Sequence, residues 1–344
     1  MSTSGYLLRP SSPDDLPDLE RFGAASAFGV NSLPSDRERL RQKLLLSQQS
    51  FQAKDDPSGE ERYLFVLEDR ATGRVIGTSG IAATAGFHDR FYSYRNEYLV
   101  HASEALGEVH RLHTLHLCHD LTAYTLLTSF YIEPEYEHTL APQLLSRARL
   151  LFIAEYADRF SDRIAAESPG LCDELGHCPF WDAVGRRFFN MDYPQIEQLC
   201  EGRSKSFIAD LMPHSPVYVP LLPEAAQWSL GQLHPDAELP FSILLDEGFE
   251  AETYLDIFDG GPIVESRLPL IKTIRNGWHG PLQTAADTPA GSPYLIVKPG
   301  LEDFRATIAP ATLGSEGLSV PETVASLLQT QAGATVRAAP LKLG

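Results

Sequence analysis

The chain has 344 residues, enough for two domains, and its 43% hydrophobic and 22% charged content excludes disordered, collagen-like and coiled-coil proteins. It carries 28 Lys and Arg against 46 Asp and Glu, which gives a formal net charge of −18. That negative field repels phosphate backbones and anionic lipid. We therefore expect neither nucleic acid nor a membrane surface as a partner, and a cationic small molecule is favoured.

The cysteines indicate a reducing compartment. They form neither a CxxC pair nor the dense ladder of a small secreted domain, and they stand at Cys118, Cys172, Cys178 and Cys200. The first residues lack the basic and apolar segments of a secretion signal, and no later stretch approaches about 18 apolar residues. We expect reduced thiols and a cytoplasmic location.

Apolar spacing in the first half alternates between the strand period and the helix period. It predicts, in chain order, a strand at 6–9, helices at 16–22 and 36–48, strands at 63–68 and 74–81 joined at Gly73, strands at 112–117 and 124–132, a helix at 140–156, a strand at 163–167 and a helix at 180–189. This order of helices and strands is typical of an α/β (α+β) fold with mixed strand pairing.

The second half partly repeats the first. A helical stretch at 224–230 precedes a helix at 241–248, which ends in a glycine suited to a left-handed cap, and a strand follows at 254–258. This resembles the helix through Trp181, so we predict two related modules, at residues 1–200 and 201–284. A loop at about 284–292, rich in Ala, Gly, Pro and Thr, and a short strand at 294–297 predict a small β-rich C-terminal segment at residues 285–344.

Four histidines spaced by three residues are the most conspicuous local pattern: His110, His113, His116 and His119. Successive side chains of a strand alternate between its faces, so at most two of the four converge. The spacing of Cys172, His177 and Cys178 matches no standard zinc site. We predict ordinary side chains and no metal.

Two further positions have both a structural and a chemical interpretation. Asp256 and Asp259, in the segment Asp-Ile-Phe-Asp-Gly-Gly-Pro, sit at a predicted strand end, where they either shape a tight turn or face a guanidinium or ammonium group. His234 follows a helical stretch, where an imidazole either interacts with the negative end of the helix dipole or serves in catalysis.

Longer phrases spread over about residues 5–275 resemble a known family. They are Asn31-Ser-Leu-Pro, Phe65-Val-Leu-Glu-Asp, Leu99-Val-His-Ala-Ser, Ser129-Phe-Tyr-Ile-Glu-Pro, Pro179-Phe-Trp-Asp-Ala-Val-Gly-Arg-Arg-Phe-Phe, Ala209-Asp-Leu-Met-Pro, Gly231-Gln-Leu-His-Pro and Tyr254-Leu-Asp-Ile-Phe-Asp-Gly-Gly-Pro. Together they resemble arginine N-succinyltransferase, of the acyl-CoA N-acyltransferase (GNAT) superfamily. The phrases beginning at Cys118, Leu126 and Tyr218 are most similar to the alpha subunit of the two-subunit form.

The resemblance implies a GNAT-like fold and transfer of succinyl from succinyl-CoA, as cosubstrate, to the α-amine of L-arginine, or for some relatives ornithine, in arginine catabolism. It places the catalytic proton donor on His234 and the acyl-CoA contact of a splayed central strand on Phe130, beside Tyr131 and Ile132. Asp256 and Asp259 are our candidates for binding the amino-acid substrate. No permanently bound cofactor is implied.

One departure from the superfamily pattern concerns the loop after the central strand. That loop usually carries glycines that let backbone N–H groups approach a pyrophosphate, but residues 135–143 contain none. The departure predicts weakened CoA binding or dependence on a related beta subunit. We therefore keep three hypotheses: an active chain working as a homo-oligomer or heteromer, a non-catalytic or regulatory subunit, and an amino-acid-binding module. For the anionic groups of the cosubstrate, the arginines available are Arg147, Arg149, Arg186 and Arg187.

Overall fold

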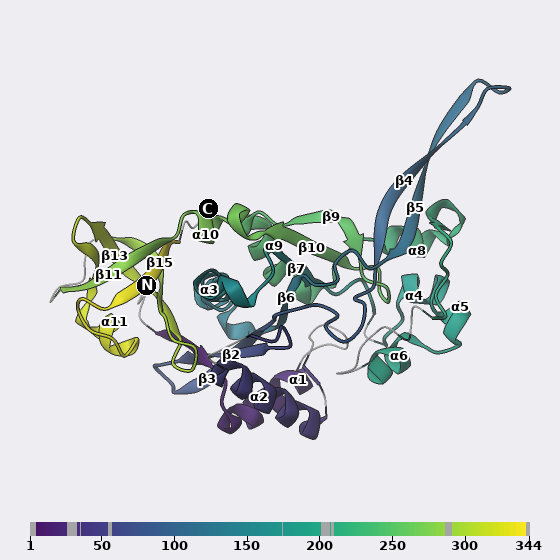
Figure 1. Cartoon of the computed structure of the whole chain (residues 1–344). Helices are drawn as coiled ribbons and strands as arrows, with labels where there is room; N and C mark the ends of the chain where they lie inside the picture. The colour runs from purple at the N-terminus through teal and green to yellow at the C-terminus, as the bar shows by residue number, and fades with distance from the viewer. Residues whose placement is uncertain are drawn as a thin grey trace.

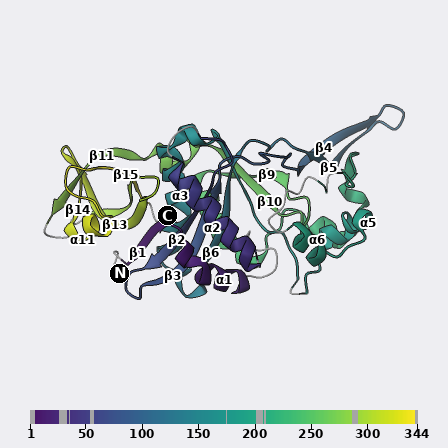
Figure 2. The same cartoon turned by 60° about the horizontal axis from the view of Figure 1, so that its bottom comes forward.

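A computed structural model gives the fold (Figures 1 and 2). It describes residues 5–25, 33–34, 36–53, 57–173, 175–200, 207, 210–285 and 291–341. Asn31 and Ala209 of the quoted phrases, and residues 286–290 of the predicted loop, lie outside the described residues. Over the described ranges, none of the helices has the length and apolar character needed to cross a bilayer.

Within this part of the chain the strands join in one 15-stranded sheet of order β12-β15-β11-β14-β13-β1-β2-β3-β6-β7-β10-β9-β4-β5-β8. The strands are β1 (Tyr6–Pro10), β2 (Arg62–Asp69), β3 (Arg74–Ala82), β4 (Ser93–Ser103), β5 (Glu108–Cys118), β6 (Thr125–Ile132), β7 (Arg163–Glu167), β8 (Val217–Tyr218), β9 (Glu250–Leu255), β10 (Pro262–Arg267), β11 (Trp278–Ala285), β12 (Ser292–Lys298), β13 (Arg305–Gly314), β14 (Gly317–Pro321) and β15 (Thr335–Pro340).

The helices lie on the faces of this sheet or group together beside β8. They are α1 (Leu16–Ala25), α2 (Arg37–Gln52), α3 (Ala141–Glu155), α4 (Pro179–Ala183), α5 (Arg186–Phe189), α6 (Tyr193–Cys200), α8 (Glu224–Ser229), α9 (Glu238–Glu247), α10 (Lys272–Arg275) and α11 (Glu322–Leu327). The mixed helix and strand class predicted from the sequence is therefore confirmed, and so is a strand-rich C-terminal region.

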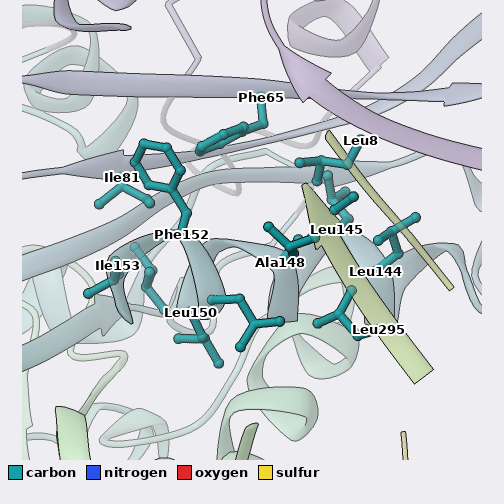
Figure 3. Close-up of a cluster of buried hydrophobic side chains, with 14 of the residues drawn as sticks. Leu8, Phe65, Ile81, Leu144, Leu145, Ala148, Leu150, Phe152, Ile153 and Leu295 are labelled. Atoms are coloured by element: carbon teal, nitrogen blue, oxygen red, sulfur yellow. The ribbon is translucent and has the colours of Figure 1, made fainter. Parts of the chain in front are cut away.

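Helix α3 lies in the middle of the molecule, with strands on several sides (Figure 1). Its residues from Leu144 to Ile153 are all buried, as expected for a helix that is apolar on nearly every side. The Phe152 ring packs at 5.0–5.9 Å from the rings of Phe51, Tyr63, Phe65 and Phe304. Figure 3 shows this core, in which Leu8 of β1 and Leu295 of β12 also lie. First and last strands thus share one core around α3.

The C-terminal strands continue the sheet of the N-terminal ones. Strand β13 pairs antiparallel with β1 through Leu8 and Ala306, while β1 pairs with β2 along its whole length. In the other direction β10 pairs with β7, and β9 pairs with both β10 and β4. The division into modules at residues 200 and 284 stays a prediction.

Two predicted elements differ in the structure. The helix predicted at 180–189 is split into α4 and α5 at Gly185, where a Cβ would lie 2.1 Å from the Trp181 ring. The strand predicted at 254–258 begins earlier and ends at Leu255, because the Asp256 carboxylate accepts the Phe258 amide at 2.7 Å and turns the chain.

Strands β4 and β5 form a long hairpin arm that projects from the body (Figures 1 and 2). The sequence predicted only part of β5 and missed β4. Along β5, His110 contacts Glu108, His113 contacts Asn96 and stacks on Tyr98, and His116 contacts Thr114. The described residues contain no group of three or more His, Cys, Asp or Glu arranged to hold a metal ion.

Candidate functional site

The parting of two central strands positions the candidate site. β6 and β7 run parallel and pair through Thr125 with Ile164 and Leu126 with Ala165. Beyond Leu126, β6 stays paired with β3 as far as Ile132, whereas β7 follows β10. The β7-facing edge of β6 after Leu126 therefore has no ladder partner among the described strands.

A β-bulge interrupts β6 at this point. The register with β3 shifts between Thr128 and Tyr131, and Ser129 has a φ of 54°, a left-handed conformation that is unfavourable for a residue with a side chain. Bulges turn backbone amides and side chains away from the ladder. At the bulge, the edge of β6 that has separated from β7 therefore carries peptide groups that no longer point along the β3–β6 ladder.

The Lys43 ammonium of α2 reaches this bulge from one face of the sheet. Its Nζ donates to the Ser129 Oγ at 2.8 Å. Burial, and to a smaller extent Arg62, lowers the pKa of Lys43 to about 8. The bulge therefore has beside it a cation whose charge is lost not far above neutral pH.

Arg149 of α3 reaches the bulge too. Its guanidinium is buried and donates to the carbonyl oxygens of Gly80 at 3.3 Å and Thr128 at 3.4 Å, and to the Ser146 carbonyl and hydroxyl. It also lies 5.8 Å from the centre of the Phe130 ring. Burial lowers the pKa of Arg149 to about 9, which leaves it charged at neutral pH. Arg149 holds the carbonyls that flank the bulge.

The three neighbouring residues predicted to contact acyl-CoA divide between the two faces of β6. Phe130 packs against the core around α3, and Ile132 belongs to that core. Tyr131 packs with Phe22 of α1, with ring centres 4.8 Å apart. All three lie on the part of β6 that has parted from β7, and their contact with acyl-CoA stays a prediction.

His234 lies on the β7 side of the opening. Its amide donates to the Pro169 carbonyl at 2.9 Å, just after β7, and its neighbour Leu233 bridges to Gly170. The imidazole is 16% exposed, and its Nδ1 accepts the Asp236 amide at 3.2 Å. That bond favours the neutral tautomer with its proton on Nε2.

Asp256 and Asp259 shape the turn that follows β9. The Asp256 Oδ1 accepts the amides of Phe258 and Asp259 at 2.7 and 3.3 Å. The two Asp259 oxygens accept the amides of Gly261 at 2.7 Å and Gly170 at 2.8 Å, and Tyr193 contacts it at 3.5 Å. Both carboxylates are buried. Asp259 thereby ties this turn to the segment after β7, with which Leu233 and His234 pair, and substrate binding by either carboxylate stays a prediction.

The glycine-free loop before α3 satisfies its own amides. The Thr139 hydroxyl accepts the Ala141 amide at 3.1 Å, Pro142 has no N–H, and the Leu144 amide bonds to the Leu140 carbonyl. The first turn of α3 carries no acidic residue, so its dipole still favours an anion. Few backbone N–H groups remain there to bind a phosphate.

Sequence reasoning missed Lys43 and Ser129 as site residues and did not place Arg149. A charged residue within the apolar run of residues 144–153 signals a buried cation, and that signal could have found Arg149. Of the other arginines, Arg147 pairs with Glu247 at 3.1 Å, and Arg186 pairs with Asp182 and Asp192 on the surface. A cavity of about 460 Å³ is lined by residues 86–90 and 92, from the connection between β3 and β4, and by Phe207 and Asp210, and no predicted site residue lines it.

Comparisons with known proteins agree with the resemblance in the sequence. A family model described as "Arginine N-succinyltransferase beta subunit" matches residues 6–273, and one described as its C-terminal domain matches residues 279–340. The chain is 48% identical over 302 residues to "Arginine N-succinyltransferase subunit alpha" of Pseudomonas aeruginosa strain PAO1, covering 88% of this chain and 89% of that protein. It is 39% identical over 337 residues to subunit beta of the same strain, covering 97% and 98%.

A solved structure is similar over nearly the whole chain. It is "arginine/ornithine succinyltransferase subunit AI from Pseudomonas aeruginosa", with a TM-score of 0.88 and 43% identity, covering 98% of this chain and 99% of that one. The predicted family, with greater similarity to alpha than to beta subunits, and the predicted fold are confirmed.

The hydrogen bonds that Asp259 accepts from Gly261 and Gly170 predict that this carboxylate stabilises the folded protein. Asp259→Asn replaces one acceptor oxygen by a donor facing a backbone N–H, so we expect the free energy of unfolding to fall by roughly 1–3 kcal/mol. Urea unfolding measures it, with Asp246→Asn, on an exposed site of α9, as the matched control. Unchanged stability together with a raised KM for the amino-acid substrate would instead assign Asp259 to substrate binding.

Proposed function

The chain belongs to the arginine N-succinyltransferase family, whose members are acyltransferases, and we propose that it transfers the succinyl group of succinyl-CoA to the α-amine of L-arginine. The similarity extends over almost all of the chain, which supports a complete catalytic unit. Acceptance of ornithine as a second substrate is part of the same proposal, since the solved relative is named for both amino acids.

The parting of β6 and β7 carries this proposal, because it leaves one strand edge open and because the segment after β7 holds the backbone of His234 on the other side of the opening. The amide groups of pantetheine can pair with the open edge of β6 around Phe130. The thioester carbonyl then comes near the re-aimed peptide groups of the bulge, which suits stabilisation of an oxyanion. The acyl group and the amine meet between Phe130 and His234.

The reaction forms one C–N bond and breaks one C–S bond. The α-ammonium group first loses a proton to water, and the neutral amine attacks the thioester carbon to give a tetrahedral intermediate with an oxyanion and a positively charged nitrogen. Collapse of the intermediate breaks the C–S bond and releases the CoA thiolate, while the nitrogen loses its second proton. The thiolate must then gain a proton. In the tautomer favoured by the Asp236 amide, His234 presents Nε2–H, which can donate a hydrogen bond to the oxyanion, and the second proton of the attacking nitrogen passes through water to the thiolate.

The first test is arginine-dependent release of the CoA thiol by the purified chain. We expect release with succinyl-CoA and L-arginine, and we expect His234→Ala to lower kcat by about 10²- to 10⁴-fold while binding of succinyl-CoA is retained. The matched control is His279→Ala, on an exposed site of β11. Full activity in His234→Ala would remove His234 from the mechanism. Release only after addition of a beta-type subunit would contradict independent catalysis.

Lys43 offers a means of selecting the acyl group. Succinyl differs from acetyl by a terminal carboxylate, and the Lys43 ammonium stands at the bulge where the acyl group is proposed to lie. We propose that this ammonium faces the succinyl carboxylate. Since an ammonium attracts a carboxylate only while it is protonated, the selection should weaken as pH rises through about 8, the pKa of Lys43.

Lys43→Met should lower the ratio of kcat/KM for succinyl-CoA to that for acetyl-CoA by about tenfold or more, because one charge-assisted bond is lost. Steady-state kinetics with both cosubstrates from pH 6.5 to about 9.5 measure the ratio. Lys43→Arg is the control, since its charge persists across that range and its ratio should stay flat. An unchanged ratio in Lys43→Met would contradict the assignment.

The hairpin arm supports assembly with a second chain. β4 pairs with β9 only at Tyr94 and Arg95, and β5 pairs with β8 only at Thr114 and Leu115, so the outer part of the arm is a two-stranded ribbon. Its apolar side chains are exposed, Tyr98 by 52%, Val100 by 67% and Val109 by 70%. Isolated ribbons are marginally stable, and open strand edges readily pair. Similar proteins are named as subunits, and we propose that the arm contacts a second copy of this chain.

Sedimentation velocity tests this assembly. The purified chain should sediment as an oligomer, and Val109→Glu should shift it toward the monomer, because the charge would be buried in the contact. Val324→Ala, a core change in α11 far along the chain from the arm, should leave the oligomer intact. A monomeric wild-type chain, or one that associates only with a beta-type subunit, would contradict self-association through the arm.

A further inference from the structure

A second cluster of cationic side chains lies where the first strands meet the C-terminal strands, away from the β6–β7 opening. The antiparallel register of β1 and β13, with Leu8 opposite Ala306, sets Arg9 opposite Arg305. A cavity of about 220 Å³ opens beside them. Its polar lining comes from β1, from β2 and the turn after it, from β13, and from the end of α11 and the residues after it. The lining consists of Arg9, Glu68, Arg70, Arg305, Ser326 and Gln329.

The arginines of this cavity are not equally satisfied. Arg9 binds both oxygens of Asp15, at 2.8 and 2.9 Å, and shares Glu68 with Arg70. Arg305 has no such partner: its Nε is buried without a hydrogen bond, and none of the ion pairs among the described residues includes it. Glu68 is thus the one carboxylate in a lining that holds three guanidinium groups.

The electrostatics around Arg305 are unfavourable to its own charge. Burial is the largest cause that lowers the pKa of Arg305, and the neighbouring charges of Arg9 and Arg70 lower it further, against a weaker opposite influence of Glu68 and Asp303. Asp303 itself contacts Lys298. Arg305 thus lines the cavity among like charges and without an ion-pair partner, and an anion beside its guanidinium would offset their repulsion.

We propose that this cavity binds a small oxyanion, of the carboxylate or phosphate type, with Arg305 as its main ligand. The planar fork of a guanidinium matches two oxygens of either group. The Ser326 hydroxyl and the Gln329 amide line the same space and supply neutral donors. The volume is below the roughly 300–1,000 Å³ of sites for drug-sized ligands, so it suits a small ion rather than a CoA molecule.

Such an ion would join the two ends of the chain. Arg9 and Glu68 belong to β1 and β2, whereas Arg305 and Ser326 belong to β13 and α11. An anion bound between them connects the N-terminal strands to the C-terminal region and stabilises only the folded arrangement. This inference concerns a site separate from Phe130 and His234, and it does not rest on the proposed reaction.

Thermal unfolding and calorimetry in low-salt buffer test the site. Inorganic phosphate and succinate are titrated separately, and at least one of them should raise the Tm saturably and bind with one site per chain. If only phosphate stabilises the protein, the site binds the phosphate type. If only succinate does, it binds the carboxylate type, and if both do, it recognises the chemistry that the two oxyanions share. If neither phosphate nor succinate binds saturably, the proposal is overturned.

Variants separate this site from a general salt effect. Arg305→Gln should raise the Kd about tenfold or more, because the unpaired charge and its fork are removed, while leaving the protein at least as stable without added anion. Arg70→Gln, at the more exposed side of the cavity, should weaken binding less and serves if Arg305→Gln folds poorly. Arg41→Gln, on the exposed surface of α2, is the control. Equal anion stabilisation of Arg305→Gln, Arg70→Gln and Arg41→Gln would overturn the proposal.

Discussion

The burial of α3 on nearly all sides is the constraint on which the rest of the structure depends. A surface helix needs one apolar stripe, but a helix enclosed by other elements must be apolar around its circumference. Phe152 alone meets aromatic rings from α2, β2 and the segment before β13. The first strands and the C-terminal strands are therefore held by the same helix, and β13 can complete the sheet beside β1.

The same helix controls the geometry of the candidate site. Arg149 is one of two buried cations in a mostly apolar segment, and its cost of burial is offset by four acceptors, whereas Arg147 pairs with the Glu247 carboxylate. Two of those acceptors are the carbonyls on either side of the β3–β6 ladder at the bulge. Packing of α3 thus fixes the bulge, and the bulge fixes which peptide groups face the space left by β7.

Local spacing predicted most elements, because the helix and strand periods are strong in β1 to β3, α2, α3 and β6. The spacing failed where contacts between residues distant in sequence determine where an element begins or ends. Gly185 lies at the split between α4 and α5, where the Trp181 ring leaves no room for a Cβ, and β4 is a largely polar strand whose register comes from β5. For the site, the resemblance supplied Phe130 and His234, whereas Lys43 meets Ser129 only through the packing of α2 on the sheet. No periodicity specifies that contact.

The net charge of −18 and an anionic cosubstrate are compatible only if cations are concentrated locally. An acidic exterior attracts a cationic amino acid at long range, while a buried cation acts at short range, where water screens it less. Lys43 and Arg149 stand at the bulge in this way. The start of α3 cannot contribute equally, because Thr139 and Pro142 leave it few free amides. The proposed binding of the CoA phosphates would therefore depend on side chains more than on the backbone of this loop.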